Sequence, residues 1–386
     1  MLVLSSYREI AAARVLLQPR RVVVIGNFDG VHRGHKALLA HARELARTGG
    51  PAGGEGSVVV LTFAPHPARL LAPQLAPPLL SSTQRKRELL AVAGVDVLVE
   101  QTFDRAFSQL SPAEFVEQVL LGSADSGLGA SAVVVGYDFS FGKSRAGNTQ
   151  MLAELLARHG ATVSVMPPVS VADPVTGSEL LCSSTLVRQA VQAGQPERAA
   201  LLLGHDPELE GEVVHGAGRG RTIGVPTANL RCTTEVLPAV GVYAAWAELL
   251  EPEMDAMASA GPGGELPVAA GQAAGADVVV AQLRRVRLRL PAAVNVGYNP
   301  TFTSSRGDSP VSQTERSVAP VSPISIEAHL LQSPGEPPLP SLYGQTLRLR
   351  FVTRVRAEQK FPSVAALVAQ IGQDVREVAG HLGVSR

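Results

Sequence analysis

The sequence predicts an α/β domain with a parallel sheet and helices, followed by an antiparallel β-barrel with a C-terminal helix. Two observations predict this division. Up to residue 204, Val-rich apolar runs alternate with helical patterns, which is typical of strands buried on both faces of a parallel sheet. From residue 205 on, apolar residues alternate in short runs that Gly, Pro and Thr interrupt, which is typical of a small closed barrel. We therefore expect two domains, 1–204 and 205–386, each long enough for its own core.

The elements of the first domain follow from these patterns. Apolar runs predict strands, and helical patterns, one of them capped by Ser111, lie between and after them. In such sheets, ligands bind beyond the carboxyl ends of the strands. Segments 27–35, 63–67 and 136–142 follow three strands, so we expect them to converge on one crevice. The expected strands are 22–25, 57–63, 95–99, 132–135 and 162–166, and the expected helices are 36–47, 84–93, 112–121, 149–158, 186–193 and 197–203.

The composition excludes several classes of protein. Lys plus Arg equals Asp plus Glu at 34 each, so there is no net electrostatic attraction to nucleic acid or an anionic membrane. No stretch of 18 residues lacks charge and turn residues, and residues 1–21 do not resemble a signal peptide. Cys182 and Cys232 are too few for a disulfide framework or a zinc site. We expect a cytoplasmic enzyme with small-molecule partners, neither nucleic acid nor membrane, that is a monomer or a weak homo-oligomer.

Two histidines follow the first Val-rich strand. Gly26 and Gly30 let the backbone turn ahead of a helix, and a helix N-terminus favours phosphate groups. His32 and His35 are three apart on the first helical turn, where imidazoles can donate hydrogen bonds to oxygens whose charge grows in a transition state. The segment therefore predicts a nucleotide site that carries out chemistry.

Other polar residues have structural as well as functional interpretations. His66 stands between two prolines and, taken alone, is typical of a turn. Phe139 and Phe141 are typical of a core, and the hydroxyl residues 183–185 are typical of a helix cap. The positions of the first three beyond strand ends favour the functional interpretation.

The run Gly-Asn-Phe-Asp-Gly-Val-His-Arg-Gly-His, residues 26–35, resembles the HxGH signature of the nucleotidyltransferase superfamily. Its form is that of bacterial bifunctional riboflavin kinase/FAD synthetases. Residues 62–67, 135–142 and 183–188 resemble further motifs of that family, in the same order. The resemblance implies a Rossmann-like nucleotidyltransferase domain that adenylylates FMN with ATP, giving FAD and pyrophosphate.

The resemblance also implies roles for individual residues. His32 and His35 would hold the ATP phosphates and the developing charge, and Arg188 would contact phosphate oxygens from one turn along its helix. The further ATP-binding residues would be Gly26, Asn27, Phe28, Gly34, Ser183, Ser184 and Thr185, and those that contact flavin or nucleotide Phe63, His66 and Asp138.

The sequence pattern of the second half predicts short strands. The runs 284–289 and 348–356 are basic and alternate with apolar residues, so we interpret them as strands with a solvated face rather than a nucleic-acid surface. The segments 251–276 and 303–323 are expected to be surface loops. The expected strands are 211–215, 241–249, 278–290, 324–331 and 346–355, with a helix at 364–375.

Residues 216–230 carry the main functional signal of this half. Glycine allows close backbone approach to phosphates but is weak evidence alone. Pro-Thr-Ala-Asn, residues 226–229, resembles the riboflavin kinase motif, although Val225 stands where that family usually has Phe. The resemblance implies that Thr227 and Asn229 ligate a Mg²⁺ between ATP phosphates and that Glu327 is the general base on the riboflavin 5′-hydroxyl. It further implies ATP contacts at Gly216, Gly218, Gly224 and Pro226, and flavin contacts at Arg354, Arg356 and Phe361.

The sequence thus predicts a bifunctional transferase with riboflavin, FMN and ATP as substrates. One alternative is an adenylyltransferase whose barrel only senses flavin, but Thr227, Asn229 and Glu327 together argue against it. The opposite alternative, a kinase with an inactive first domain, is opposed by the two histidines together with Ser184 and Arg188. A nucleic-acid-binding barrel does not fit the zero net charge and the 4% aromatic content.

Overall fold

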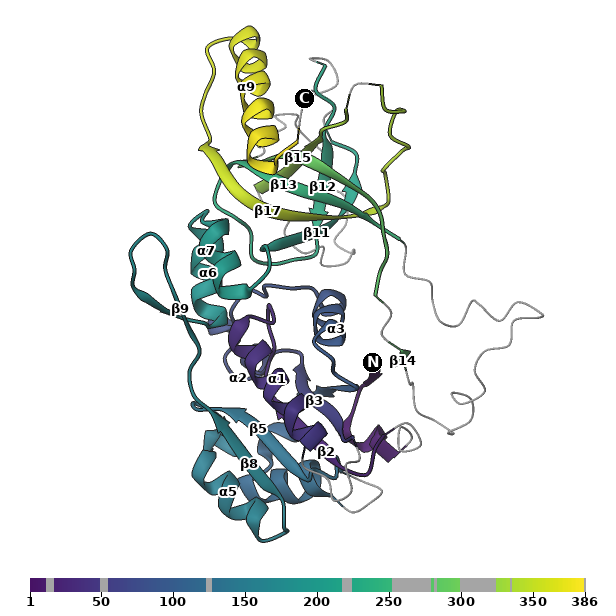
Figure 1. Cartoon of the computed structure of the whole chain (residues 1–386), viewed down its shortest axis with the longest axis vertical. Coiled ribbons are helices and arrows are strands. Elements are labelled where there is room, and N and C mark those ends of the chain that lie inside the picture. The colour runs from purple at the N-terminus through teal and green to yellow at the C-terminus, as the bar shows by residue number, and fades with distance from the viewer. Residues whose placement is uncertain are drawn as a thin grey trace, which may run out of the picture. The chain divides into compact units, whose positions relative to one another are not determined.

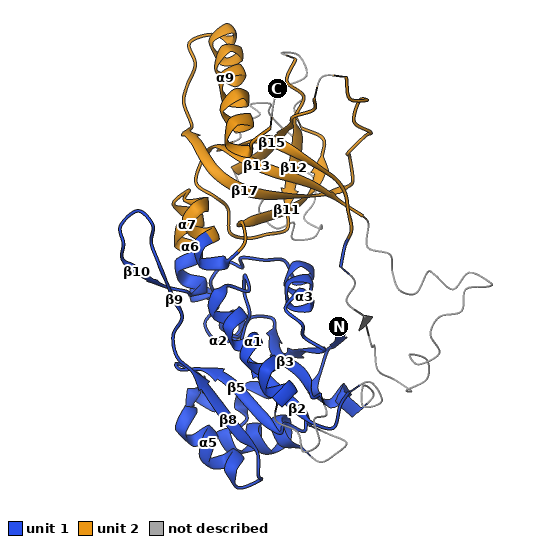
Figure 2. Cartoon of the chain, in the orientation of Figure 1, with its two compact units in different colours: residues 1–187, 201–204, 253–284 blue, residues 188–200, 205–252, 285–386 orange. Residues whose placement is uncertain are grey.

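The computed structural model describes residues 1–11, 17–48, 55–122, 127–216, 224–251, 279–280, 283–298, 324–333 and 335–384 (Figure 1). The chain forms two compact units (Figure 2). Unit 1 comprises residues 1–187, 201–204 and 253–284, and unit 2 comprises residues 188–200, 205–252 and 285–386. The boundary between 204 and 205 remains a prediction.

Unit 1 is built on a seven-stranded sheet. All neighbouring strands are parallel except the edge pair β14–β1. The five predicted strands are confirmed, whereas β1 and β14 were not predicted as members of this sheet. In spatial order the strands are β14 (Val279–Val280), β1 (Leu2–Leu4), β4 (Val97–Thr102), β3 (Ser57–Ala64), β2 (Arg21–Ile25), β5 (Ala132–Gly136) and β8 (Thr162–Met166).

The helices of unit 1 begin close to their predicted positions. Ser111 forms a capping box with Glu114 at the start of α4, which continues as a π-helix over Phe115–Leu121. A short helix, α2, begins at Pro67, so the segment around His66 is more than the turn that its two flanking prolines suggested. The helices are α1 (Arg33–Thr48), α2 (Pro67–Leu71), α3 (Thr83–Val92), α4 (Pro112–Glu114) and α5 (Thr149–Ala157), and α6 (Ser184–Gln192) and α7 (Pro196–Leu203) follow where the sequence passes into unit 2.

Short elements complete unit 1. They include two hairpins, β6–β7 and β9–β10, and four 3₁₀ turns. The hairpin strands are β6 (Ser140–Phe141), β7 (Gly147–Asn148), β9 (Ser170–Ala172) and β10 (Glu179–Leu181), and the turns are Tyr7–Ala11, Pro73–Leu75, Phe107–Gln109 and Lys143–Arg145.

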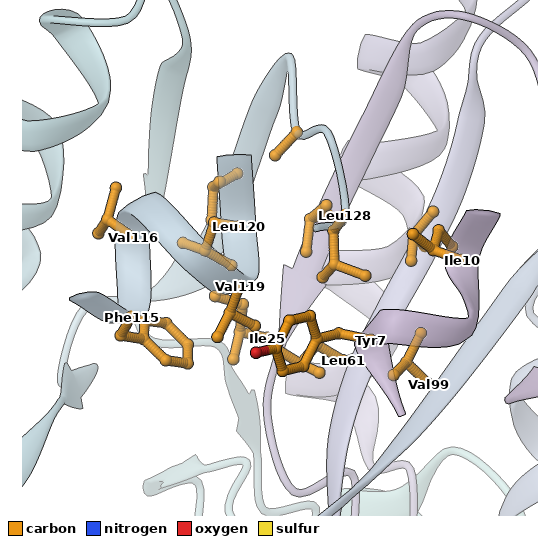
Figure 3. Close-up of a cluster of buried hydrophobic side chains, with 14 of the residues drawn as sticks. Tyr7, Ile10, Ile25, Leu61, Val99, Phe115, Val116, Val119, Leu120 and Leu128 are labelled. Atoms are coloured by element: carbon orange, nitrogen blue, oxygen red, sulfur yellow. The ribbon is translucent and has the colours of Figure 1, made fainter. Parts of the chain in front are cut away.

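Both faces of this sheet are buried. Ile25 and Leu61 pack with Phe115 and Val119 of the π-helix on one face (Figure 3). On the other face, Val24 and its neighbours pack against α1. Because alternate residues of each strand point to opposite faces, a segment buried on both sides is expected to be apolar throughout, as Val22–Ile25, Val58–Leu61 and Ala132–Val135 are. The packing fixes where β2 ends and therefore where the histidine loop begins.

Unit 2 contains a closed antiparallel barrel. Its strand β12 was not predicted, and its last helix is longer than the predicted 364–375. Ser363 caps that helix, and Gly383 ends it with a φ of +66°. Around the barrel the strands are β11 (Glu208–Val214), β12 (Ala228–Cys232), β16 (Ile324–Leu330), β15 (Val286–Tyr298), β13 (Gly241–Leu250) and β17 (Thr346–Ala357), and the helix is α9 (Val364–Leu382).

Two expectations about the basic strands were wrong. The predicted strand 278–290 is divided, because Val279–Val280 pairs with β1 whereas β15 begins at Val286. Arg348 is buried, not solvated, because it lies opposite Glu210 and Glu248 of the neighbouring strands and pairs with Glu210 at 2.7 Å. The predicted loops 252–276 and 303–323, together with Gly218, lie outside the described residues. Within the described residues, no helix has the length and apolar character needed to cross a membrane.

Candidate active sites

The loop between β2 and α1 brings His32 and His35 into ring contact. Their ring centroids are 3.7 Å apart with an interplanar angle of 23°, and the Phe28 ring lies 4.9 Å from that of His35. The backbone N–H of His35 donates to Nδ1 of His32 at 3.4 Å. Since Nδ1 of His32 accepts this bond, the ring carries its proton on Nε2. The His32 ring therefore offers a donor at Nε2.

His35 has a buried ring nitrogen. Its Nδ1 has no hydrogen-bond partner among the described residues, although the ring as a whole is only partly buried. Burial is the main cause that holds the pKa of His35 well below its usual value, and positive charge on His32, when that ring is protonated, and on Lys86 lowers it further. His35 is therefore a neutral imidazole near neutral pH. A buried polar atom without a partner is costly, and a ligand atom would satisfy it.

The loop that carries the histidines is strained and anchored. Phe28 and Val31 have positive φ values of 50° and 42°, which non-glycine residues rarely adopt, and both are fully buried. The buried Asp29 carboxylate accepts hydrogen bonds from the backbone N–H groups of Leu80 and Ser81 at 2.9 and 3.4 Å. These bonds fasten the loop to the segment just ahead of α3.

The hydroxyl residues of the motif at residues 183–188 have different roles. Ser184 Oγ donates to the Asp29 carbonyl at 2.9 Å, which joins the start of α6 to the histidine loop. Ser183 Oγ accepts from the Leu186 N–H at 3.3 Å, as a helix cap does. Thr185 is exposed, and Arg188 is nearly buried one turn further along α6.

Position 34 has little room for a side chain. A Cβ there would lie 3.0 Å from Cε1 of His32 and 3.1 Å from the carbonyl oxygen of Cys182. A side chain would therefore need the His32 ring and the Cys182 backbone to move by a few tenths of an ångström. At Gly26, a Cβ would lie 3.2 Å from the Phe28 ring. Both predicted phosphate-site glycines thus allow close packing around the histidine pair.

The three motif segments follow adjacent strands β3, β2 and β5, so they share one edge of the sheet. Thr62 of β3 donates to the Asn27 carbonyl at 3.2 Å. Phe63 packs against an aromatic neighbour at a centroid distance of 5.6 Å, and His66 Nδ1 caps α2. Asp138 is exposed after β5, and the next two aromatic residues, Phe139 and Phe141, stack at 5.5 Å and contribute to the core.

In unit 2, three polar residues lie side by side on three neighbouring strands of the barrel. Asn229, Glu327 and Asn295 are direct partners on β12, β16 and β15. Direct partners point to the same face, and the neighbours Ile326 and Ala328 point into the core. The three polar residues therefore lie on the outer face, with Thr227 Oγ1 3.5 Å from Glu327 Oε2. Asn295 was not predicted as a site residue, since its position depends on strand register.

The residues around this row pack tightly. An ideal Cβ on Gly216 would overlap the side-chain amide of Asn229, so a side chain at position 216 would force this amide to move. Gly224 has a φ of +78°, and the Pro226 carbonyl is 2.8 Å from Nδ1 of His329. The predicted phosphate loop thus begins and ends close to Asn229.

The comparisons with known proteins match both halves. A family model described as FAD synthetase matches residues 16–180, and one described as riboflavin kinase matches residues 203–382. The bifunctional riboflavin kinase/FMN adenylyltransferase of Escherichia coli (strain K12) is 31% identical over 371 residues, 95% of this chain and 94% of its own length. The chain belongs to this bifunctional family. It carries a FAD synthetase domain followed by a riboflavin kinase domain.

Other relatives agree with this assignment. The bifunctional enzyme of Bacillus subtilis (strain 168) is 29% identical over 363 residues, 93% of this chain and 92% of its own length. A crystal structure described as a macrolide-efflux protein from Streptococcus pneumoniae is 27% identical, covers 93% of both chains and has a TM-score of 0.66. Similarity therefore extends over both domains of the bifunctional family.

The flavin-contact residues predicted for the kinase domain all have partners within unit 2. Arg354 donates to the Val240 carbonyl, and Arg356 forms a two-point ion pair with Asp374 of α9 at 2.8 and 2.7 Å. The Arg356 guanidinium also lies 5.7 Å from the centroid of the Phe361 ring. These contacts tie β17 to α9. The contact of all three residues with flavin stays a prediction.

Proposed function

We propose that unit 2 phosphorylates riboflavin to FMN and that unit 1 adenylylates this FMN to FAD, with ATP as the second substrate of each reaction. The observation that carries the assignment is the presence of two separate polar clusters. One is the stacked pair His32 and His35 at a helix start, and the other is the row Asn229, Glu327 and Asn295 on the barrel. Each cluster belongs to the unit whose family model describes that reaction.

In the adenylyl transfer, an FMN phosphate oxygen attacks the α-phosphorus of ATP. The bond from that phosphorus to the bridging oxygen breaks, and pyrophosphate leaves with the electron pair. His32 donates from Nε2, and the neutral His35 ring donates to phosphate oxygens as their charge grows. Ser184, Thr185 and Arg188 would hold the departing pyrophosphate. Positioning and charge stabilisation are sufficient, since no covalent intermediate is needed.

In the kinase reaction, Glu327 takes the proton of the riboflavin 5′-hydroxyl as its oxygen attacks the γ-phosphorus of ATP, and ADP leaves. Asn295, the direct partner of Glu327, lies where it can orient the carboxylate or the hydroxyl. The oxygens of Thr227 and Asn229 beside a carboxylate suit Mg²⁺, which prefers hard oxygen ligands. When bound with ATP, the ion would neutralise phosphate charge.

The finer assignments belong to the same proposal. The enzyme works in the cytoplasm on free riboflavin and FMN, with a domain boundary between 204 and 205. Asp138, Phe63 and His66 contact flavin or nucleotide in unit 1. In unit 2, Gly216, Gly218, Gly224 and Pro226 approach the ATP phosphates, and Arg354, Arg356 and Phe361 close over flavin.

The test incubates the purified chain with riboflavin, ATP and MgCl₂ and separates the flavins by chromatography over time. We expect riboflavin to fall, FMN to rise transiently and FAD to accumulate with pyrophosphate. Replacing MgCl₂ with a chelator should stop riboflavin consumption. Accumulation of FMN without FAD would contradict the assignment of unit 1. Failure to consume riboflavin while added FMN is converted to FAD would contradict that of unit 2.

A further inference from the structure

Three consecutive basic residues of α3 lie in different environments. Arg85 pairs with Glu88 at 2.9 Å. Arg87 donates from Nε and Nη2 to the two carboxylate oxygens of Glu100 at 3.0 and 2.6 Å. Lys86, between them, has neither an ion pair nor a side-chain hydrogen bond with any described residue. The two arginines therefore form ion pairs within unit 1. The ammonium of Lys86 forms none with a described residue.

The position of Lys86 is fixed relative to the histidine loop. Asp29 accepts from the N–H groups of Leu80 and Ser81, and Ser81 Oγ accepts from the N–H of Gly30 at 3.4 Å. These bonds hold the loop against the residues just ahead of α3, whose cap is Ser82. Lys86 stands close enough to His35 for its charge to lower the pKa of that ring. Lys86, one turn beyond that cap, therefore lies on the part of α3 that these hydrogen bonds hold against the histidine loop.

The surroundings of Lys86 do not satisfy its charge. Burial is the main cause that lowers the pKa of Lys86, and Glu100 and Asp29 only partly oppose it. Both carboxylates are already engaged, Glu100 by Arg87 and Asp29 by backbone N–H groups. A partly buried ammonium without a direct partner is unfavourable, and an anion that enters the site relieves this cost.

We propose that Lys86 binds a phosphate group of the substrates at the His32–His35 site, as a third donor beside the two imidazoles. The inference rests on the proposed adenylyl transfer in unit 1. Both substrates present phosphate oxygens there, ATP through its triphosphate and FMN through its monophosphate. Lys86 supplies the full positive charge that two neutral imidazoles lack. An ammonium also suits this contact because it acts as a point charge on phosphate.

The test compares FAD formation by wild type, Lys86→Met and Lys86→Arg, with added FMN so that the kinase step is not needed. Met keeps the length of the side chain and removes its charge. We expect Lys86→Met to lower kcat/KM by about 30- to 300-fold, comparable to the loss of one preorganised donor to a charged oxygen. Lys86→Arg should recover most of this loss. Arg158→Met, which removes an exposed charge from unit 1, should stay within about twofold of wild type, as surface changes usually do.

The kinetic pattern identifies the phosphate. A rise confined to KM for ATP, together with weaker inhibition by inorganic pyrophosphate, assigns the contact to the ATP phosphates. A rise confined to KM for FMN assigns it to the FMN phosphate. A fall in kcat alone places the contact in the transition state. All three outcomes support phosphate binding by Lys86 when the melting temperature of the variant equals that of wild type.

Two results would overturn the inference. One is activity of Lys86→Met within twofold of wild type. The other is an equal loss in the Met and Arg variants with a lower melting temperature, which would mean a structural role. If wild type itself made no FAD, the proposed function would fail separately. Calorimetric binding of inorganic pyrophosphate would then decide the Lys86 contact, because wild type should bind it at least tenfold more tightly than Lys86→Met.

Discussion

The candidate phosphate sites of the two units are built from opposite sets of groups. In unit 1 the candidate site consists of donors, namely two imidazoles and the Lys86 ammonium, where a strained loop enters α1. In unit 2 it consists of a carboxylate, two amides and a hydroxyl on the outer face of barrel strands. In a parallel sheet, loops and helix N-termini lie at the ligand site. Helix N-termini favour anions directly. A strand face presents only side chains, and an acceptor-rich row needs a cation to bind phosphate.

Both units also bury ion pairs, and in unit 1 the Glu88 side chain, 2% exposed, pairs with Arg85 and Arg284 at 2.9 and 2.6 Å. Both faces of the unit 1 sheet are packed with aliphatic and aromatic side chains. The barrel buries an ionic cluster in which Arg348, 4% exposed, pairs with Glu210 at 2.7 Å and approaches Glu248 at 3.8 Å. Substitutions can therefore test catalysis and stability separately in each unit.

Glu327→Gln should have the largest effect. Gln keeps the shape of the side chain but cannot accept the hydroxyl proton, so FMN formation should fall by about 10³-fold, within the range of general-base catalysis. Conversion of added FMN to FAD should stay within twofold of wild type. The two rates are measured on the same preparation by flavin chromatography. Equal loss of both reactions would contradict separate sites.

His35→Ala should reduce FAD formation from FMN by about 10²-fold, because one donor to the developing charge is lost. Riboflavin phosphorylation should not change, since Glu327 and its partners belong to unit 2. His159→Ala removes an exposed histidine of the same unit and serves as the matched control. A loss of similar size in the control would show that the rate responds to folding rather than to the imidazole.

Arg348→Met should lower the free energy of unfolding of unit 2 by about 3–5 kcal/mol, because it removes the cation that pairs with the buried Glu210 carboxylate. Urea unfolding monitored by the fluorescence of Trp246, the one tryptophan of the chain, measures this. Arg231→Met breaks an ion pair whose side chains are 69% and 44% exposed, so it should cost at most about 1 kcal/mol. Similar costs for the two variants would disprove the role of burial.

The smallest expected effect is a difference between wild type and His35→Asn in how stability changes with pH. The folded-state pKa of His35 is lowered, so the unfolded chain binds more protons there, and stability falls as the pH drops below about 6.5, the ordinary value for histidine. His35→Asn cannot take up this proton. Its melting temperature should fall less than that of wild type between pH 7 and pH 5, as measured by circular dichroism. Parallel curves would mean that His35 is not a neutral, buried group.

Much of the fold could be predicted because long apolar runs determine it. Strands such as Val22–Val24 are buried on both faces, and a run of this kind has few other solutions. Strand β12 was not predicted because its five residues, Ala228–Cys232, include Asn and Arg and show no clear alternation. β1 has only three residues, and β14 only two, so neither gives a pattern.

The candidate sites could be predicted where one segment carries them and not where they depend on tertiary structure. The two histidines lie three residues apart at the start of α1, so their proximity follows from local sequence. Asn295 joins Glu327 only through the register of β15 and β16. Lys86 is distinguished from Arg85 and Arg87 by having no ion pair with a described residue, which three adjacent basic residues on a helix do not reveal. The roles of Asn295 and Lys86 depend on contacts between residues that are far apart in the sequence.

The most direct test of two independent sites is a mixing experiment with riboflavin, ATP and MgCl₂. Glu327→Gln alone should leave riboflavin unchanged, and His35→Ala alone should accumulate FMN with little FAD. An equimolar mixture should form FAD, because FMN released by one variant is adenylylated by the other. Chromatography of the flavins over time provides the measurement. FAD formation by Glu327→Gln alone at the wild-type rate, or no FAD from the mixture, would contradict the account.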